Sequence, residues 1–183
     1  MKLYVDEYHD KNLNFEHMFS DLPEDTIEYI NQWKNNTDKI TGNIYGNERI
    51  LFIFYLYNHE NKNKELIGFL IMKEFPADPY HIEEYTDVTL EDSPFNLFEI
   101  PLYNEHIPYF DKPYMIDHRY IIPKFRNKGF GTRMVKHIIK KGYDFMITPT
   151  NDAAIKSVIK SGCVTYGRYK DDEGPIDYVF RSS

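Results

Sequence analysis

The feature that most constrains the fold is an ordered run of segments in the last third of the chain. An apolar stretch, PYMIDHRYIIP (113–123), is typical of a β-strand that ends at a proline. The segment 130–141 follows, and its apolar residues recur at helical spacing. YDFMITP (143–149) then has the composition of a second strand. A strand, a helix and a strand in this order predict an α/β domain.

The remaining segments complete this domain. RILFIFYLYN (49–58) and ELIGFLIMKEF (65–75) predict a hairpin, and the second strand is apolar enough to be buried on both faces. Other predicted elements are a strand at 2–8, helices at 13–20 and 23–36, a helix from Asn151 to Gly162, and a hairpin at 164–170 and 175–181. Without repeats or linkers, the 183 residues predict one domain, 1–183.

The composition restricts compartment and partners. A net charge of -7 disfavours a nucleic-acid partner. The single cysteine, Cys163, cannot form an internal disulfide, and without a C-x-x-C motif we expect no metal. The N-terminus is too charged for a signal peptide, and no apolar run approaches the roughly 18 residues of a membrane span. We therefore expect a soluble, cytoplasmic protein with no membrane partner; its oligomeric state stays open, a homodimer being one option.

An acidic, aromatic insertion at about 76–111 has no clear periodicity. It holds nine carboxylates and no Lys or Arg. One interpretation is a solvated acidic surface. The other is a segment that covers a binding cleft and attracts a cationic ligand through charge and cation–π contacts.

The stretch PKFRNKGFGTRM (123–134) indicates an anion site. Gly129 and Gly131 lead into a predicted helix, and glycine lets backbone approach a ligand closely. A helix N-terminus presents unpaired N–H groups and a partial positive charge, which suits a pyrophosphate. Neither the P-loop pattern nor the dinucleotide-binding fingerprint fits these residues. Taken alone, G-x-G before a helix is also compatible with a plain tight turn.

The wider pattern is more specific. Ile121 to Gly131 follow apolar–x–Pro–x–x–Arg/Gln–x–x–Gly–x–Gly/Ala position by position, and Asn151 opens the next helix. This order resembles the GNAT superfamily, the GCN5-related N-acetyltransferases, closely over 114–162 and more loosely before. The long 76–111 segment departs from the family, in which this connection is usually short. The resemblance implies a mixed central sheet flanked by helices and splayed into a V.

The same resemblance implies acetyl-CoA as acyl donor. The pantetheine arm would lie between the strands at 114–122 and 143–148. It would bond to the backbone near Arg119, Tyr120 and Ile121. Asn151 would contact the arm, or act only as a helix cap. The residues implied for the pyrophosphate are Arg126, Asn127, Lys128, Gly129, Phe130, Gly131 and Thr132.

The implied reaction is direct attack of a primary amine on the thioester, for which a base must remove a proton. Family members often place an acid Tyr where this chain has Val158. Relatives that modify protein N-termini often place a catalytic Glu where it has Met146. Both departures argue against an N-terminal acetyltransferase of that type and leave the acid unassigned. Tyr166, Tyr169 and Tyr178 are unranked replacements.

Two residues of the predicted strand are candidates for the base, Asp117 and His118. Strand alternation places Asp117 on the face of Arg119 and Ile121, with His118 on the opposite face. Asp117 could instead form an ion pair with Arg119. We expect Cys163 to serve packing, because nothing nearby suggests the low thiol pKa that covalent acyl transfer needs.

The predicted function is therefore acetyl transfer from acetyl-CoA to a cationic small-molecule amine or a lysine side chain. A first alternative is an inactive acyl-CoA-binding module of the same fold. A second is a toxin-like acetyltransferase of aminoacyl-tRNA, which the acidic balance disfavours.

Overall fold

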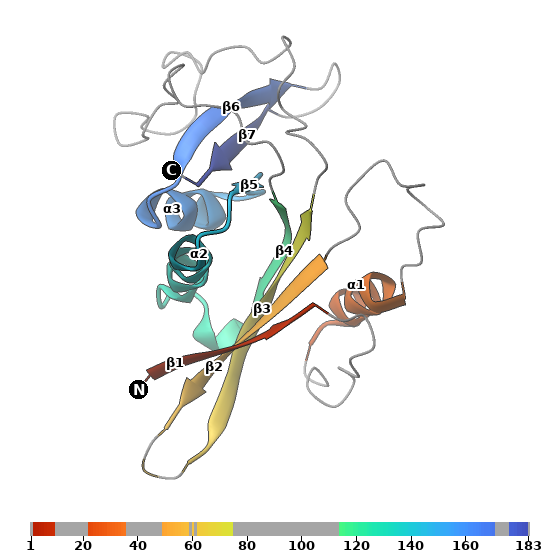
Figure 1. Ribbon diagram of the computed structural model, residues 1–183, viewed down its shortest axis with the longest axis vertical. Coiled ribbons are helices and arrows are strands. Elements are labelled where there is room, and N and C mark those ends of the chain that lie inside the picture. The colour runs from red at the N-terminus through yellow and green to blue at the C-terminus, as the bar shows by residue number, and fades with distance from the viewer. Residues whose placement is uncertain are drawn as a thin grey trace.

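The computed structural model describes residues 2–9, 22–35, 49–58, 60, 62–74, 114–170 and 176–182 (Figure 1). The elements in chain order are β1 (Lys2–Tyr8), α1 (Glu24–Asn35), β2 (Arg49–Tyr57), β3 (Lys64–Glu74), β4 (Tyr114–Ile121), the 3-10 helix η3 (Pro123–Phe125), α2 (Phe130–Lys141), β5 (Phe145–Ile147), α3 (Asp152–Lys160), β6 (Val164–Lys170) and β7 (Ile176–Arg181).

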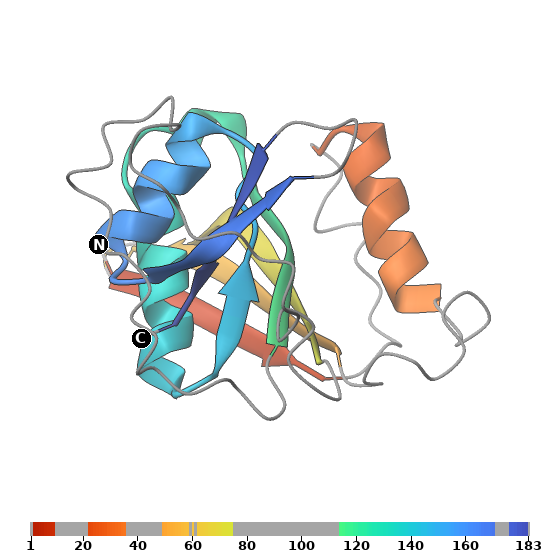
Figure 2. The same cartoon turned by 90° about the horizontal axis from the view of Figure 1, so that it is seen from above.

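In these residues the strands form one seven-stranded sheet, in the order β1-β2-β3-β4-β5-β7-β6. All neighbours are antiparallel except β4 and β5, which are parallel. Helices α2 and α3 cover one face of the sheet and α1 lies on the other (Figure 2). The predicted α/β class with a mixed sheet between helices is therefore confirmed.

The β2–β3 hairpin forms the centre of the core. Ile50 and Phe52 belong to the apolar cluster beneath α2 and α3. Leu51 and Ile53 belong to the cluster on the opposite face, together with Ile30 of α1. Because alternate side chains of a strand point to opposite faces, both faces of this hairpin are buried. Burial of β3 on both faces was predicted, and β2 is buried in the same way.

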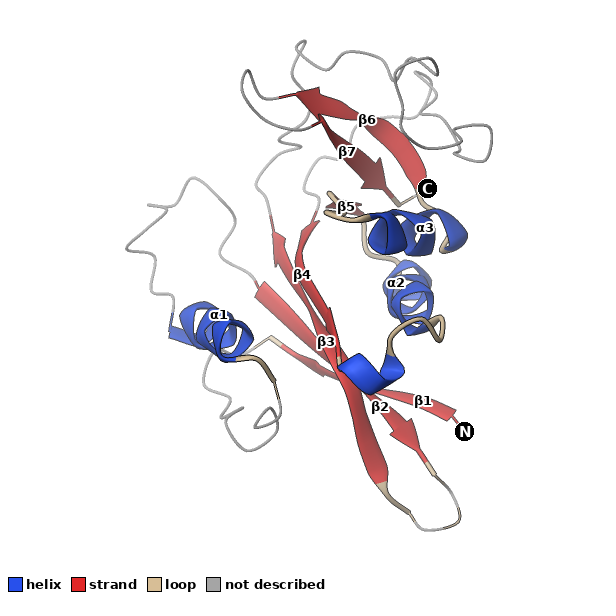
Figure 3. Cartoon of the chain, turned by 180° about the vertical axis from the view of Figure 1, so that it is seen from behind, coloured by secondary structure: helices blue, strands red, loops and turns tan. Residues whose placement is uncertain are grey.

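The sheet opens between its two parallel strands. Among the described residues, β4 and β5 pair at three positions, Tyr114↔Phe145, Met115↔Met146 and Ile116↔Ile147. Beyond them β4 continues along β3 as far as the pair of Ile121 with Gly68. Residues 117–121 therefore have β3 on one side and no β5 partner on the other. Figure 3 shows β4 running away from β5, which confirms the predicted V-shaped opening.

A β-bulge lies at the start of this opening. His118 pairs with Ile71 and Ile116 pairs with Met72, so Asp117 is an extra residue between two consecutive pairs. Strict alternation, which placed Asp117 on the face of Arg119, does not hold across the bulge. The reason is that one inserted residue breaks the two-residue period of a strand.

The boundaries of α2 agree with the predicted helix at 130–141, and Gly142 caps it through an N–H bond to the Ile139 carbonyl (2.9 Å). Strand β5 is shorter than the predicted 143–149.

The predicted helix at 13–20 and the 76–111 insertion lie outside the described residues. None of the helices in the described part of the chain is long and apolar enough to cross a membrane.

Candidate ligand-binding site

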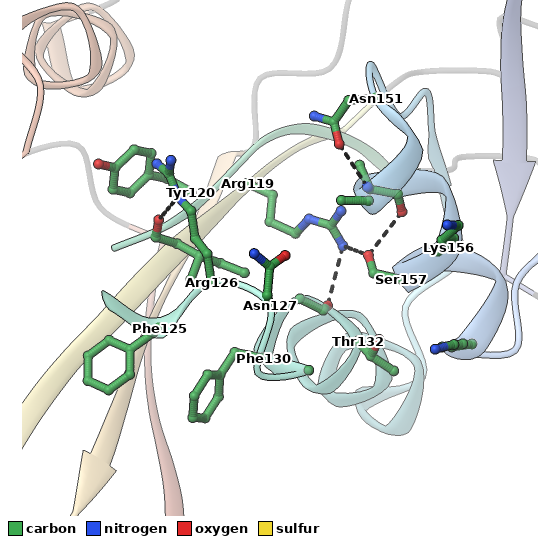
Figure 4. Close-up of a pocket in the computed structure, with 16 residues that line it drawn as sticks. Arg119, Tyr120, Phe125, Arg126, Asn127, Phe130, Thr132, Asn151, Lys156 and Ser157 are labelled. Carbon is green, nitrogen blue, oxygen red and sulfur yellow. Dashed lines mark hydrogen bonds between the residues drawn. The ribbon is translucent and has the colours of Figure 1, made fainter. Parts of the chain in front are cut away.

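A cavity of about 560 Å³ lies where β4 leaves β5, between the N-terminal end of α2 and the side of α3 (Figure 4). Its sixteen lining residues come from four parts of the chain. They are Arg119, Tyr120 and Ile121 of β4, Phe125, Arg126, Asn127 and Gly129 of η3 and the loop after it, Phe130, Gly131 and Thr132 of α2, and Asn151, Ala153, Ala154, Lys156, Ser157 and Lys160 at α3.

The charge of this lining is entirely positive. Four of the lining residues are cations (Arg119, Arg126, Lys156 and Lys160), and none of the sixteen is Asp or Glu. The chain as a whole carries a net charge of -7. A cationic cavity in an acidic protein is suited to an anionic ligand, because clefts of one sign concentrate the field on their contents.

The N-terminus of α2 opens into this cavity. Asn127 and Gly129 both have positive φ, 60° and 79°, and turn the chain into the helix. Within the described residues no side chain caps the first N–H groups of α2. The N-terminus of α3 differs, because the Asn151 Oδ1 accepts from the Ala154 N–H (2.9 Å). The uncapped donors of α2 can therefore serve a bound anion.

Two of the predicted phosphate ligands need comment. Arg126 donates from Nε to the Ile121 carbonyl (2.9 Å) and lies 5.5 Å from the centre of the Tyr120 ring. Its guanidinium is thereby held at the end of β4, beside the cavity. Lys128 is not among the lining residues; it is exposed and lies near the Phe125 ring instead. All the predicted cofactor residues except Lys128 line the cavity, although their role stays a prediction.

Arg119 occupies the interior of the site. Its Nη1 donates to the Ser157 Oγ (2.7 Å) and to the Gly131 carbonyl (3.3 Å). These bonds connect β4 to both α3 and α2. Burial lowers the pKa of the Arg119 guanidinium, but an arginine stays charged at neutral pH.

The two predicted base candidates lie away from the cavity lining. Asp117 is exposed at the bulge. His118 faces the α1 side of the sheet, where it stacks on Phe69 with ring centres 5.5 Å apart. Burial lowers the His118 pKa, while Asp117 and Asp25 act to raise it. The net shift favours the neutral imidazole, which is the form that can accept a proton.

The two positions that departed from the family pattern, Met146 and Val158, are part of the core, and so is Cys163. Met146, Val158 and Cys163 are completely buried, with no measurable exposure. Burial raises the pKa of the Cys163 thiol to about 12, although Arg119 acts to lower it. A thiol with this pKa is a poor nucleophile, which supports the interpretation of Cys163 as a packing residue. The side chains of the three tyrosines on β6 and β7 lie outside the described residues.

Sequence reasoning missed three polar residues of α3. Lys156, Ser157 and Lys160 line the cavity, opposite the apolar stripe that includes Ile155 and Val158. Their spacing of three and four residues puts them on one side of a helix, and this signal was readable from the sequence. Among the described residues no three His, Cys, Asp or Glu side chains gather as a metal site.

No protein-family model matches the chain, and no curated protein sequence matches it either. Solved structures do resemble the chain. The aminoglycoside acetyltransferase AAC(6')-Ib in complex with coenzyme A superposes with a TM-score of 0.52 at 16% identity, over 98% of this chain and 95% of that chain. A histone acetyltransferase HPA2 and related acetyltransferase from Corynebacterium glutamicum superposes with a TM-score of 0.50 at 12% identity, over 100% of this chain and 96% of that chain.

The chain has the GNAT fold. The resemblance inferred from residues 114–162 is therefore confirmed at the level of the fold. At these identities the similarity concerns the fold alone. Within this GNAT fold, the cationic cavity lies at the opening between β4 and β5, next to the uncapped end of α2.

Proposed function

We propose that the chain is an N-acyltransferase that moves an acetyl group from acetyl-CoA to a primary amine. The observation that carries this proposal is the cavity with four cations, no carboxylate and an uncapped helix N-terminus. The phosphates of coenzyme A are the natural ligands of such a lining. The coenzyme A bound to the aminoglycoside acetyltransferase of the same fold is consistent with this.

The proposed donor would lie along the free edge of β4. Its pyrophosphate would accept from the N–H groups at the start of α2, from Asn127 to Thr132. Its pantetheine amides would pair with β4 between residues 117 and 121, where β5 offers no partner. An added strand of this kind satisfies backbone groups that would otherwise lose their bonds away from water.

The reaction then needs a neutral amine. The amine nitrogen attacks the thioester carbonyl carbon, the C–N bond forms, and the C–S bond breaks as the thiolate leaves with the electron pair. A lysine-like amine has a pKa of about 10.4, so a base must take its proton. Asp117 and His118 remain the proposed bases or amine contacts, and both lie just beyond the last β4–β5 pair.

The proposed acceptor is a cationic small molecule or a lysine side chain. Support comes from the composition of the 76–111 insertion, which contains nine carboxylates and no Lys or Arg to compensate their charge. Carboxylates and aromatic rings both attract ammonium groups. The proposed partners are therefore acetyl-CoA and an amine.

A second candidate function is an acyl-CoA-binding module without catalysis. It is favoured by Val158, which replaces the usual acid Tyr and is buried in the core of α3. This candidate shares the donor site and differs in the chemistry alone.

The test has two parts. Isothermal titration with acetyl-CoA measures donor binding, and a thiol reagent measures coenzyme A release with polyamines, aminoglycosides and lysine peptides. Binding together with amine-dependent release supports the enzyme. Binding without release above background supports the binding module, and absence of binding refutes both. A Lys160→Met variant, which removes one cavity cation, should weaken donor binding.

A further inference from the structure

Arg119 has a particular position along the cavity. The last pair between β4 and β5 is Ile116 with Ile147, and Ile116 faces α2 and α3. Asp117 is the extra residue of the bulge, and His118 points to the α1 side. Arg119 is therefore the first side chain on the α2 and α3 face beyond the point where the strands separate. Among the cavity residues of β4, it is the one closest along the strand to the last pair with β5.

The charge of Arg119 is not balanced by any described residue. Its hydrogen bonds go to two neutral oxygens, the Ser157 hydroxyl and the Gly131 carbonyl, and both use Nη1. Ser157 is fixed as an acceptor, because its own hydroxyl donates to the Ala154 carbonyl (2.9 Å). None of the ion pairs in the described part of the chain includes Arg119. A partly buried cation without a carboxylate is costly unless a ligand supplies the counter-charge.

The other three cations of the cavity have a different role available. Arg126, Lys156 and Lys160 are exposed and can reach the phosphates of coenzyme A. The pantetheine arm between the phosphates and the thioester is uncharged, and so is an acetyl group. With the pyrophosphate at the start of α2 and the arm paired along β4, the acyl end of the donor would point towards the last β4–β5 pair, and Arg119 is the cavity residue of β4 nearest to that pair along the strand.

We propose that Arg119 is a specificity residue and that the cavity prefers an acyl-CoA whose acyl group ends in a carboxylate, such as malonyl-CoA or succinyl-CoA. This inference rests on the proposed function and narrows its donor. The printed bonds of Arg119 within the described residues use Nη1, so its Nε and Nη2 groups can donate to a carboxylate, which an arginine binds through two parallel N–H bonds. Ser157 and Gly131 hold the guanidinium ready for it.

Isothermal titration of the full chain with acetyl-CoA, malonyl-CoA and succinyl-CoA tests the inference. We expect the better carboxylated donor to bind about tenfold more tightly than acetyl-CoA, as one charge-assisted contact provides. In Arg119→Met the dissociation constants for acetyl-CoA and the carboxylated donor should become about equal. Arg119→Lys should keep part of the difference, because the charge remains. Lys160→Met is the matched control, because it removes an exposed cation of the cavity. It should weaken the binding of all three donors by the same factor and leave the ratio of their dissociation constants unchanged.

Each outcome has a distinct meaning. Equal or tighter binding of acetyl-CoA by the wild-type chain overturns the inference, and so does a preference that survives in Arg119→Met. Failure of every acyl-CoA to bind refutes the proposed function as well, whereas binding without discrimination refutes the donor preference alone. Thermal unfolding establishes that each variant folds. If Arg119→Met does not fold, Ser157→Ala decides, because it releases the guanidinium without removing the charge and should reduce the preference.

Discussion

Glu7 of β1 contacts three side chains, and two of them, Lys141 and Tyr143, lie at and just after the end of α2. Its carboxylate accepts from the Lys141 Nζ (2.8 Å) and the Tyr143 hydroxyl (2.7 Å), and it lies 3.0 Å from the His9 Nε2. Burial acts to raise the Glu7 pKa, but these hydrogen bonds outweigh it and bring the pKa to about 2 from 4.5. A lowered pKa in the folded state means that the charged form stabilises the fold.

The stabilisation from Glu7 is complete above about pH 4.5 and is lost as the pH falls towards 2. Glu7→Gln should therefore lower the free energy of unfolding by about 1–2 kcal/mol at pH 7, as for hydrogen bonds to a charged group. The difference between the variant and the wild type should shrink as the pH approaches 2. Urea unfolding at pH 7, 4 and 2.5 measures it, and a difference independent of pH would refute the role of the charge.

Gly68 permits the close approach of β3 to β4. A Cβ atom at this position would lie 2.0 Å from the Tyr120 carbonyl oxygen, which is backbone and cannot rotate away. Gly68→Ala should cost about 1–3 kcal/mol in the free energy of unfolding, as for overpacked cores. It should also weaken coenzyme A binding, because β4 must shift where the pantetheine arm would pair. Chemical denaturation and titration check the two effects; unchanged stability would contradict the steric argument.

At the scale of elements, α2 has a glycine with positive φ at each end. Gly129 has a φ of 79° and Gly142 a φ of 83°, and a Cβ at either would meet nothing within 4 Å. Alanine at either position should therefore cost about 1–2 kcal/mol for the left-handed backbone alone. Gly129 shapes the turn beside the cavity, whereas Gly142 lies at the opposite end of the helix.

The two substitutions form a matched pair. Gly129→Ala should weaken coenzyme A binding beyond its cost in stability, while Gly142→Ala should lower stability by a similar amount and leave the affinity unchanged. Thermal unfolding and titration of both variants provide the comparison. Equal affinities in the two variants would show that the turn at Gly129 contributes nothing to the donor site.

The elements differ in how far the sequence predicts them. Both ends of α2 were predictable, because its apolar stripe and its terminal glycines are local signals. The bulge at Asp117 was not, because it depends on how β4 pairs with β3, and nothing in the sequence of one strand specifies its partner's register. The motif indicated the donor side of the cavity, and strand alternation placed His118 on the face opposite Arg119, as observed, whereas the break in alternation at Asp117 required the structure.

At the scale of the whole molecule, charge is distributed unevenly. A chain with a net charge of -7 concentrates four cations in one cavity. Coenzyme A binding should therefore weaken about tenfold between 0.05 and 0.5 M salt, since screening of exposed charges becomes strong over this range. Pantetheine, which lacks the phosphates, serves as the control and should show no such dependence. A salt-independent affinity for coenzyme A would argue against the cationic lining as its binding surface.

The short junction between β4 and β5 also bears on how the chain unfolds. Three residue pairs connect the β1–β4 part of the sheet to β5, β6 and β7 among the described residues, whereas β2 and β3 pair at nine. So short a junction predicts that β5–β7 form a separate cooperative unit. The backbone hydrogen bonds of this unit should open before those of the β2–β3 hairpin. Amide hydrogen exchange should find lower protection in β5 than in β3, with a bound acyl-CoA raising it; uniform protection would contradict this. A bound acyl donor would then couple the unfolding of β1–β4 to that of β5–β7.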